Sequence, residues 1–564
     1  MAKGKQEEIC WTVMVYLAGD NNLSEDMVTA LKGLQQASRA GAAGNVNIFA
    51  CFDSVYPGVK TKFYDFSTRI INKPDVLGSY VSGEDWEGES PLEVNTGRSI
   101  LNFIKWVTVR LKEKKQPPTK YNMLVLSGHG DAFRGKTLLY DENPPGGLAL
   151  DTLSSLLRKS LEFFPDDTKY SILGFDNCAM NLAEVGYEFR LVADLMIASE
   201  GFIPQSGWEY RSPIEELISR PCMEPEDLAK AFVCAFTDQE RDYAAAGRSV
   251  DLSVCDLRTL LGGCSIDLPT IDSGGEGASI ADSLDPASVG STDNLILAID
   301  QLGYYLGWPY KMADKHCRFH GNCTTVDSIA FFFQKIVTDA HWRAQTFFYE
   351  QTVDIFDFCA ILAEACDDYE NHAIDLLPES GHNAAVAYLK NLPLFRYLAC
   401  VKEACCVVLR LHQNYVLATG KTGPQFRFSK GTSVYFPWSE LSFATGGEVY
   451  SSTQVYTNGY RNWYKFIKRF TYYSMRSDEP RSICIDLSQF DCCKDPKETP
   501  RDKTGGPFRT GGPFRTGGPF RSELDVLRQY FASYKNYDSD SNFAATYPCE
   551  LCAPCPKERD AKEK

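Results

Sequence analysis

Short apolar runs alternate with amphipathic segments over the first part of the chain. The run WTVMVYLAG at 11–19 predicts a buried strand, and the apolar positions of 24–40 have helical spacing. A second apolar run, VNIFACFD at 46–53, predicts the next strand. This order of strand, helix and strand indicates a parallel β-sheet whose crossovers are helices.

The same alternation continues to about residue 200. Helices are predicted at 97–114, at 151–163 and from about Ala179. Strands are predicted to follow each of them, at 122–127, 170–175 and 194–199. Strands that alternate with helices favour a mostly parallel sheet with helices on both faces. In such sheets the functional side chains gather at the carboxyl ends of the strands.

Composition divides the chain into four parts. We expect an α/β core over 1–265 and a flexible linker or surface excursion over 266–293, where Gly, Ser, Asp and Ala dominate. A mainly helical portion over 294–475, with a late strand at 432–439, completes the folded unit. The remaining 476–564 is predicted to be a tail, because its threefold TGGPFR repeat cannot bury enough apolar surface to fold.

The formal net charge of −16 argues against two classes of partner. Nucleic acids and anionic membranes are bound through clustered Lys and Arg, and an acidic chain does not favour such clusters. No apolar run approaches the roughly 18 residues that read as a membrane span. The run at 9–18 follows GKQEE, whose glutamates cancel the positive charge of a signal peptide, so we interpret it as a buried strand.

Twenty cysteines are scattered along the chain without an evident secretory leader. This distribution favours reduced thiols and a cytoplasmic protein, since disulfide frameworks are typical of short secreted chains. We expect most of these cysteines to be small core residues.

Two motifs stand at the carboxyl ends of neighbouring predicted strands. SGHGD carries His129, the first histidine in the chain, and GFDNC ends in Cys178. A thiol needs a nearby base to act as a nucleophile, and histidine titrates in the useful range. The N–H groups of Gly130 and Cys178 are candidates for an oxyanion hole. A helix from about Ala179 would favour the Cys178 thiolate through its dipole.

The chain resembles the clostripain-like cysteine peptidases of the caspase, gingipain and legumain superfamily in MVYLAGDNNL, SGHGD, GFDNCAMNLAEVGYEF, ASEGFIPQSGWEY, DIFDF and GTSVYFP, which span roughly 10–470. The resemblance implies a caspase-like α/β fold, with His129 as catalytic histidine and Cys178 as nucleophile. It also implies that Asp176 selects Arg or Lys at P1, because a carboxylate in the S1 pocket binds a cation and rejects an acidic side chain. Glu200 is a second candidate for that pocket.

Two features depart from the familiar members of that family. Asn177 and Ala179 flank the cysteine where an alanine and a leucine are common. Some members mature by self-cleavage between the histidine and cysteine segments, whereas 137–157 of this chain holds no Lys or Arg. Basic residues stand nearby only at Arg134, Lys136, Arg158 and Lys159, so the resemblance does not carry that route of activation over to this chain.

The main assignments have structural alternatives. Cys178 alone would be one more buried cysteine, and only its pairing with His129 favours catalysis. Asp176 is also suited to cap a helix N-terminus. The polar run DNN at 20–22 is explained by a turn and a helix cap, and we assign it no chemistry.

No cofactor is expected. Two cysteine-containing segments resemble metal sites only in part. The first offers His316, Cys317, His320 and Cys323 as ligands, and the second offers Cys549, Cys552 and Cys555. The first lacks a separated second ligand pair and the second lacks a fourth ligand, so zinc is not favoured. Calcium dependence stays open, because the acidic pair at 141–142 could bind the ion although no loop has EF-hand spacing.

The TGGPFR repeat is best explained as a spacer. Alternatively its arginines, Arg509, Arg515 and Arg521, are P1 residues in an accessible tether. A protease with an acidic S1 pocket would then trim its own tail.

The sequence thus predicts a cysteine endopeptidase that cleaves after Arg or Lys through a Cys–His dyad, with self-processing as a further expectation. Its partners would be proteins or peptides with basic P1 residues, and its oligomeric state is left open. One alternative is a catalytically silent or latent family member that binds proteins. Another is a peptidase that accepts a neutral Asn at P1.

Overall fold

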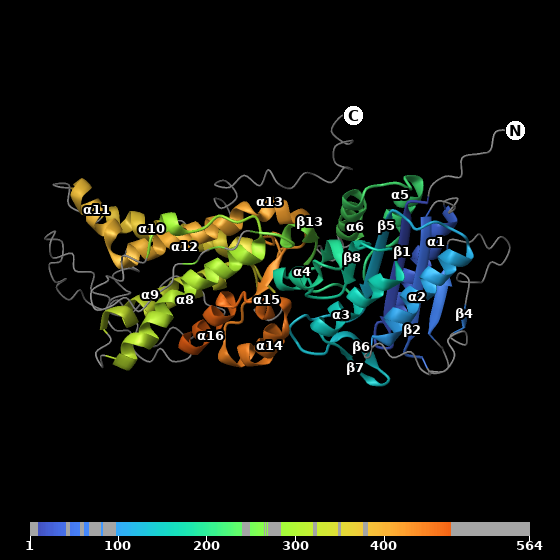
Figure 1. Cartoon of the computed structure of the whole chain (residues 1–564), viewed down its shortest axis with the longest axis horizontal. Helices are drawn as coiled ribbons and strands as arrows, with labels where there is room; N and C mark the ends of the chain where they lie inside the picture. The colour runs from blue at the N-terminus through green and yellow to red at the C-terminus, as the bar shows by residue number, and fades with distance from the viewer. Residues whose placement is uncertain are drawn as a thin grey trace, which may run out of the picture.

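The computed structural model describes residues 9–474, apart from 41–45, 57–60, 67–80, 83–96, 240–248, 264–265, 267, 269–283, 320–323, 348–350 and 376–381. Within these residues a nine-stranded sheet lies beside a bundle of helices (Figure 1). Most of the expected linker and the whole tail, with its three candidate arginines, fall outside the described part.

The main sheet has the strand order β13-β10-β9-β8-β5-β1-β2-β3-β4. In chain order its strands are β1 (Trp11–Gly19), β2 (Val46–Ser54), β3 (Lys62–Asp65), β4 (Val81–Ser82), β5 (Tyr121–Ser127), β8 (Tyr170–Asp176), β9 (Ala193–Ala198), β10 (Val250–Asp256) and β13 (Val416–Thr422). The five central strands from β2 to β9 are parallel, and the pairs toward both edges are antiparallel. The predicted mostly parallel sheet is confirmed.

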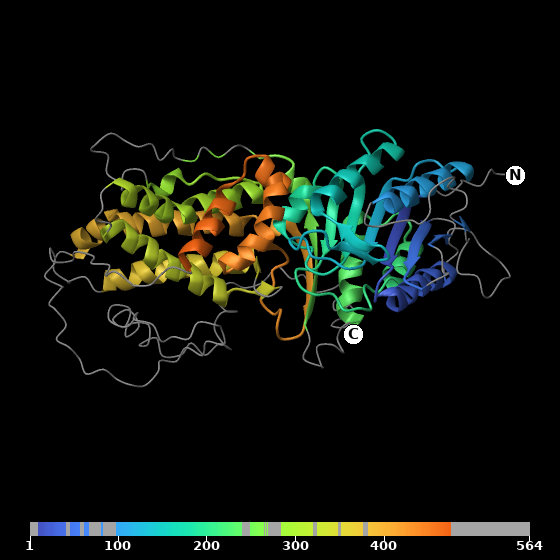
Figure 2. The same ribbon diagram turned by 90° about the horizontal axis from the view of Figure 1, so that it is seen from below.

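Helices cover both faces of the sheet because its strands are apolar on both sides. Met14 and Tyr16 of β1 face one core, and Val15 and Leu17 face the other. The first face is covered by α2 (Arg98–Glu113), α3 (Leu150–Ser160) with its extension η3 (Leu161–Phe163), and α4 (Ala183–Phe189). The second face is covered by α1 (Ser24–Ala40), α5 (Arg211–Ser219) and α6 (Pro225–Gln239). Figure 2 shows the sheet between these layers.

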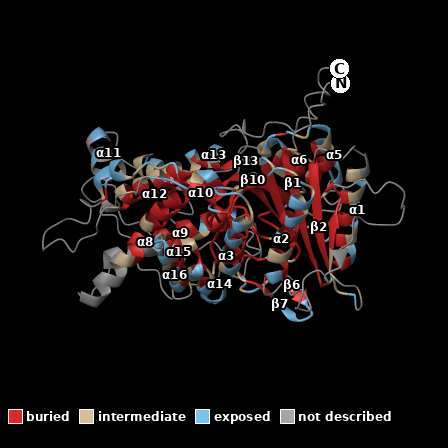
Figure 3. Cartoon of the chain, turned by 45° about the vertical axis from the view of Figure 1, so that its right-hand side comes forward, coloured by how far each residue is buried: buried red, intermediate tan, exposed pale blue. Residues whose placement is uncertain are grey.

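The C-terminal part is mainly helical, as predicted. Its elements are η4 (Leu257–Leu260), η6 (Pro286–Ser288), α8 (Leu295–Phe319), α9 (Thr324–Arg343), α10 (Ile355–Asp375), α11 (His382–Asn391), α12 (Pro393–Arg410), α13 (His412–Tyr415), α14 (Glu440–Ser452), α15 (Gln454–Thr457) and α16 (Asn462–Ser474). Their apolar side chains continue the core that α2, α3 and α4 form on the sheet (Figure 3). Among the described helices, none combines the length and apolarity needed to cross a bilayer.

Two smaller sheets accompany the main one. β11 (Thr346–Phe347), β12 (Thr352–Asp354) and β14 (Ser433–Tyr435) form a three-stranded sheet, and β6 (Leu138–Glu142) pairs with β7 (Pro145–Leu148) as a hairpin. The strand expected at 432–439 is β14, shortened to three residues. A parallel bridge between Leu182 and Ser433 joins this small sheet to the segment that precedes α4.

The edge strand β13 was not predicted from the sequence. It lies far along the chain, yet it pairs antiparallel with β10 and so belongs to the main sheet. Its VLATGKT sequence has no strong apolar alternation, and all but its first residue are half-buried. The sheet is therefore not completed within 1–265 but takes a strand from the C-terminal portion.

The cysteines divide into two groups. Eight of the described cysteines are free, and six of these lie in the core, as expected. Cys10 and Cys222, however, form a disulfide across 212 residues, so the expectation of reduced thiols is wrong for this pair. Spacing in sequence could not reveal a pairing that the fold creates. Trp11 Nε1 adds a hydrogen bond to Met223 O at 2.9 Å beside it.

Reducing this disulfide should lower the free energy of unfolding by about 2–4 kcal/mol, because the bond restricts the unfolded chain. Urea unfolding of the unmodified chain and of a chain carrying both Cys10→Ser and Cys222→Ser, both without reductant, measures the difference. The comparison omits dithiothreitol because Cys234 is also disulfide-bonded and would be reduced as well. Equal midpoints for the oxidised protein and the double variant would contradict a stabilising bond.

Candidate active site

The candidate nucleophile and base follow two strands that pair directly. β5 and β8 are parallel neighbours, and Ser127 at the end of β5 lies opposite Asp176 at the end of β8. His129 and Cys178 each come two residues after this pair. The register therefore brings both residues to the carboxyl edge of the sheet, where parallel sheets carry their functional groups.

Asn177 ties the two turns together. Its Nδ2 donates hydrogen bonds to Gly128 O at 2.7 Å and to His129 O at 3.3 Å. Gly130 packs so closely that a Cβ atom there would lie 2.5 Å from Asn177 Cβ and 2.8 Å from Cys178 O. The close approach requires a glycine at this position. Asn177, a departure from the familiar family pattern, thus holds the turn of His129 against the turn of Cys178.

The N–H groups expected to form the oxyanion hole are close together. A Cβ atom on Gly130 would lie 3.3 Å from Cys178 N. Within the described part of the chain, neither the Gly130 nor the Cys178 N–H donates a hydrogen bond to another protein group. Donors left open beside a thiol are what a developing oxyanion requires. Their role remains a prediction.

The Cys178 thiol is half-buried against the backbone of Ile203. The Ile203 N–H donates to Sγ at 3.3 Å, and the thiol donates to Ile203 O at 3.7 Å. Burial raises the pKa of the Cys178 thiol to about 11, with the carboxylates of Asp176 and Asp131 adding to the rise. The thiol is therefore protonated at neutral pH, and the expected dipole-stabilised thiolate is wrong.

The position of the helix explains this difference. α4 begins at Ala183 and not near Ala179 as predicted. Ala179 has a left-handed φ of 51°, and the N–H groups of 179–181 donate to the carbonyl oxygens of Gly201 and Ser199. Donors that would be open at a helix N-terminus are already engaged here. The start of α4 lies too far along the chain to act on the thiol, since the dipole effect is confined to the first turn.

The His129 imidazole is held by the side chain of Asn22. The His129 Nε2–H donates to Asn22 Oδ1 at 2.7 Å. Because Nε2 carries the proton in this arrangement, Nδ1 is left as the lone-pair nitrogen. Partial burial lowers the pKa of His129 from its ordinary value of 6.5, so the ring is neutral at neutral pH.

Sequence reasoning missed Asn22. The turn after β1 was interpreted as purely structural, and this holds for its neighbours: Asp20 accepts from Asn143 N and Nδ2, and Asn21 donates to Ala18 O and Tyr140 O. The available signal was topological. β1 pairs in parallel with β5, so the turn after β1 reaches the same sheet edge as His129.

The Asp176 carboxylate is buried at the end of β8 and accepts three hydrogen bonds. They come from Ser127 Oγ at 2.9 Å, Trp208 N at 3.1 Å and Tyr210 OH at 2.7 Å. Burial raises its pKa, and the three donors oppose the rise by stabilising the charged form. The alternative role as a helix cap is wrong, because α4 begins seven residues later.

One side of this carboxylate faces a glycine. Gly207 has a left-handed φ of 66°, and a Cβ atom there would lie 2.8 Å from Asp176 Oδ2. The backbone of Gly207 therefore packs directly against the carboxylate, at a distance that a larger residue would not allow.

Glu200 lies in a different environment from Asp176. Its buried carboxylate accepts from Ser433 Oγ at 2.7 Å, from Gly431 N at 3.1 Å and from Ser429 Oγ. All these donors come from the C-terminal portion, and none of them contacts Asp176. The structure therefore does not bring Glu200 to the S1 candidate; the side chain instead fixes the strand end to the second half of the chain.

No metal centre is evident in the described part of the chain. No cluster of three or more His, Cys, Asp or Glu side chains there could hold an ion. The acidic pair at 141–142 is split, with Asp141 buried and Glu142 exposed. The side chains of His316, Cys317, His320, Cys323, Cys549, Cys552 and Cys555 lie outside the described part.

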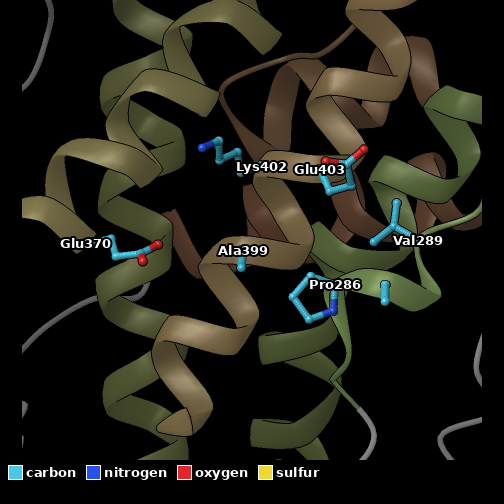
Figure 4. A pocket seen from close by; sticks show the side chains of 7 residues that line it. Pro286, Val289, Glu370, Ala399, Lys402 and Glu403 are labelled. Carbon is cyan, nitrogen blue, oxygen red and sulfur yellow. The ribbon is translucent and has the colours of Figure 1, made fainter. Parts of the chain in front are cut away.

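A hollow of about 470 Å³ opens between η6, α10 and α12 in the helical portion (Figure 4). It is lined by Pro286, Ala287, Val289, Glu370, Ala399, Lys402 and Glu403. Its charged groups are already paired, Glu370 with Lys390 at 2.8 Å and Glu403 with Arg410 at 3.1 Å. None of its lining residues is a candidate for the catalytic site.

Comparison with known proteins places this site in a family. The model of the Clostripain family matches residues 15–261, and no curated protein matches the chain. An inactive zymogen C11 protease from Parabacteroides distasonis is 15% identical, with 81% of this chain and 97% of that chain covered and a TM-score of 0.46. A secreted C11 cysteine protease from Bacteroides thetaiotaomicron, in complex with an irreversible peptide inhibitor, is 15% identical. The match covers 81% of this chain and 98% of that chain, with a TM-score of 0.43. Residues 15–261, which hold His129 and Cys178, thus match the clostripain family.

Proposed function

We propose that this cysteine protease hydrolyses peptide bonds after Arg or Lys, with Cys178 as nucleophile and His129 as general base and acid. The observation that carries the proposal is the register of β5 and β8. It sets His129 and Cys178 on adjacent turns, and the buried Asp176 is the strand end two residues before Cys178.

The chemistry follows from a protonated thiol and a neutral imidazole on adjacent turns. As Cys178 Sγ attacks the scissile carbonyl carbon, its proton passes to His129 Nδ1, and the N–H groups of Gly130 and Cys178 stabilise the oxyanion. His129 then protonates the leaving amine, and the carbon–nitrogen bond breaks to leave an acyl-enzyme. Water attacks the thioester, His129 accepts its proton, and the returning thiolate recovers that proton when the acid product leaves.

Asn22 supports this cycle as a positioning residue. Its Oδ1 fixes the ring so that Nε2 carries a proton throughout and Nδ1 exchanges the second one. When His129 is doubly protonated, the amide oxygen also stabilises the imidazolium through the same bond. The site is thus a Cys–His pair oriented by a neutral third side chain.

Selection of a basic P1 residue is assigned to Asp176. A buried carboxylate attracts a guanidinium or ammonium group, while an acidic P1 side chain would be repelled. Nucleic acid and membranes remain unexpected partners. The cytoplasmic location also remains a prediction, and the Cys10–Cys222 bond is the feature that weighs against a reducing compartment.

Fluorogenic peptides that end in Arg, Lys, Asn or Asp test the proposal. We expect turnover of the Arg and Lys peptides by the purified chain and none by Cys178→Ala. Asp176→Asn should retain the fold but lose at least tenfold in kcat/KM for basic peptides, because it removes the charge and keeps the shape. Cleavage of the Asn peptide alone would contradict a basic P1 preference and indicate specificity for Asn. Cleavage of none of the four peptides would favour a latent or binding protein.

The pH dependence of kcat/KM should show an acid limb at a pKa below 6.5, because a protonated His129 cannot accept the thiol proton. Activity should rise with pH through this value and reach a plateau near neutrality. The Cys178 pKa of about 11 adds no limb in the neutral range. A profile measured on one Arg peptide between pH 4 and 9 gives the result; an acid limb above pH 7 would contradict a neutral resting pair.

Asn22→Ala should lower kcat by about 10- to 100-fold with little change in KM, as expected for loss of an orienting hydrogen bond. Asn22→Asp keeps an acceptor oxygen and adds a negative charge, so it should restore part of kcat and move the acid limb to higher pH. A merely structural residue would not move that limb. If the alanine variant kept the full kcat, the positioning role would be refuted.

A further inference from the structure

Two phenylalanines are exposed beside the candidate nucleophile. Phe202 is 46% exposed and Phe428 is 40% exposed, although an aromatic side chain of this size is normally buried. Phe202 lies in the segment that follows β9, and Phe428 lies in the loop between β13 and β14. They come from opposite halves of the chain, more than two hundred residues apart.

Contacts between their neighbours place the two segments side by side. Ser429 Oγ donates to Glu200, and a Cβ atom on Gly201 would lie 2.5 Å from Phe426 Cε2. Phe426 is itself fixed, because its ring lies 4.8 Å from that of the buried Phe347. Phe202 and Phe428 thus each stand within one or two residues of a direct contact between the segments.

The same strand end reaches the nucleophile. Ile203, next to Phe202, donates its N–H to Cys178 Sγ, and Gly201 O accepts from Ala179 N at 2.8 Å. Arg427 lies over the Phe428 ring at 4.5 Å and so orders the outer side of the pair. Phe202 is therefore next to the residue that contacts the candidate nucleophile, and Phe428 lies in the segment that packs against the same strand end.

We propose that Phe202 and Phe428 form a subsite for an aromatic P2 side chain, and that its occupant is the tail of this same chain. The inference rests on the proposed function. Successive side chains of an extended peptide point to opposite sides. A P1 side chain directed toward the buried Asp176 leaves the P2 side chain directed away from it, where an exposed aromatic pair can cover it.

The tail contains an aromatic residue followed by a basic residue in each of its three repeats. In each TGGPFR unit a phenylalanine directly precedes the arginine, as Phe508-Arg509, Phe514-Arg515 and Phe520-Arg521. The 34 residues from Ser474 to Phe508 can extend over about 110 Å, whereas a compact protein of this size is about 60 Å across. The tail is long enough to reach the site of its own chain. Each unit then offers an aromatic P2 and a basic P1 residue together.

Two peptides that differ only at P2 test the subsite: Gly-Gly-Pro-Phe-Arg and Gly-Gly-Pro-Ala-Arg, each as a fluorogenic amide. We expect the full chain to cleave the Phe peptide with a kcat/KM about tenfold higher. Phe202→Ala and Phe428→Ala should each reduce this ratio to about threefold or less through slower cleavage of the Phe peptide. Leu441→Ala, which truncates another exposed apolar residue, is the matched control and should keep the full ratio.

The outcomes distinguish the aromatic P2 subsite from the proposed cleavage after a basic P1 residue. Equal cleavage of both peptides by the unmodified chain would overturn the aromatic subsite and leave the basic P1 preference intact. A preference that survives in both Phe variants would place the P2 subsite elsewhere. Turnover of neither peptide would overturn the proposed function and the inference with it.

Trimming of the full chain, followed by mass spectrometry, identifies the occupant. Cleavage should follow Arg509, Arg515 or Arg521 and be absent in Cys178→Ala. Replacing the three tail phenylalanines by alanine should slow trimming about tenfold, and replacing the three arginines by glutamine should abolish it. If the variant without tail phenylalanines trims at the original rate while the Phe peptide is still preferred, the tail is not the occupant.

Discussion

The whole site depends on one pairing, that of β5 with β8. Because the strands are parallel and Ser127 faces Asp176, the residues two positions later emerge together at one edge. The pairing is reinforced beyond the ladder: Ser127 Oγ donates to Asp176, and Asn177 donates to the turn after β5. A register shift by one residue would turn every side chain of a strand to the opposite face. It would separate the proposed base, the proposed nucleophile and the candidate S1 carboxylate from one another at the same time.

Two buried carboxylates fix the loop that precedes β14, and one of them, Glu200, joins the two halves of the chain through it. Glu200 at the end of β9 and Asp354 at the end of β12 both bind the loop that precedes β14, Glu200 through Ser429 and Gly431 and Asp354 through the N–H of Lys430. Burial and a neighbouring carboxylate raise the pKa of Asp354 to about 7. Such groups are costly to bury unless each oxygen finds a donor, and the loop supplies one or more donors to each carboxylate. The helical half therefore supports the candidate site, because it orders the strand end that contacts the thiol.

The sequence predicted what local pattern determines. Long apolar runs identified the central strands, including β1, β5 and β8, because strands buried on both faces leave no polar positions. Two glycine-flanked polar motifs after such strands pointed to His129 and Cys178. Other features depend on contacts between distant residues. β13 is a polar edge strand that can be recognised only from its pairing with β10. The orientation of His129 by Asn22 depends on the pairing of β1 with β5. The disulfide joins two residues that only the fold brings together. The start of α4 was misplaced because tertiary hydrogen bonds to Gly201 and Ser199 take the place of the first helical turn.

The long separation between Glu200 and its partners has a consequence for biosynthesis. A chain leaving the ribosome completes β5, β8 and β9, and with them the residues of the catalytic pair, long before it reaches Ser429 and Ser433. Domains form as their residues are synthesised, so the first half can collapse while the donors for Glu200 do not yet exist. During that interval a carboxylate that needs three donors has none of them, and the strand end beside Cys178 lacks its support. The strand end beside Cys178 therefore gains this support only after nearly all of the described part of the chain has been made.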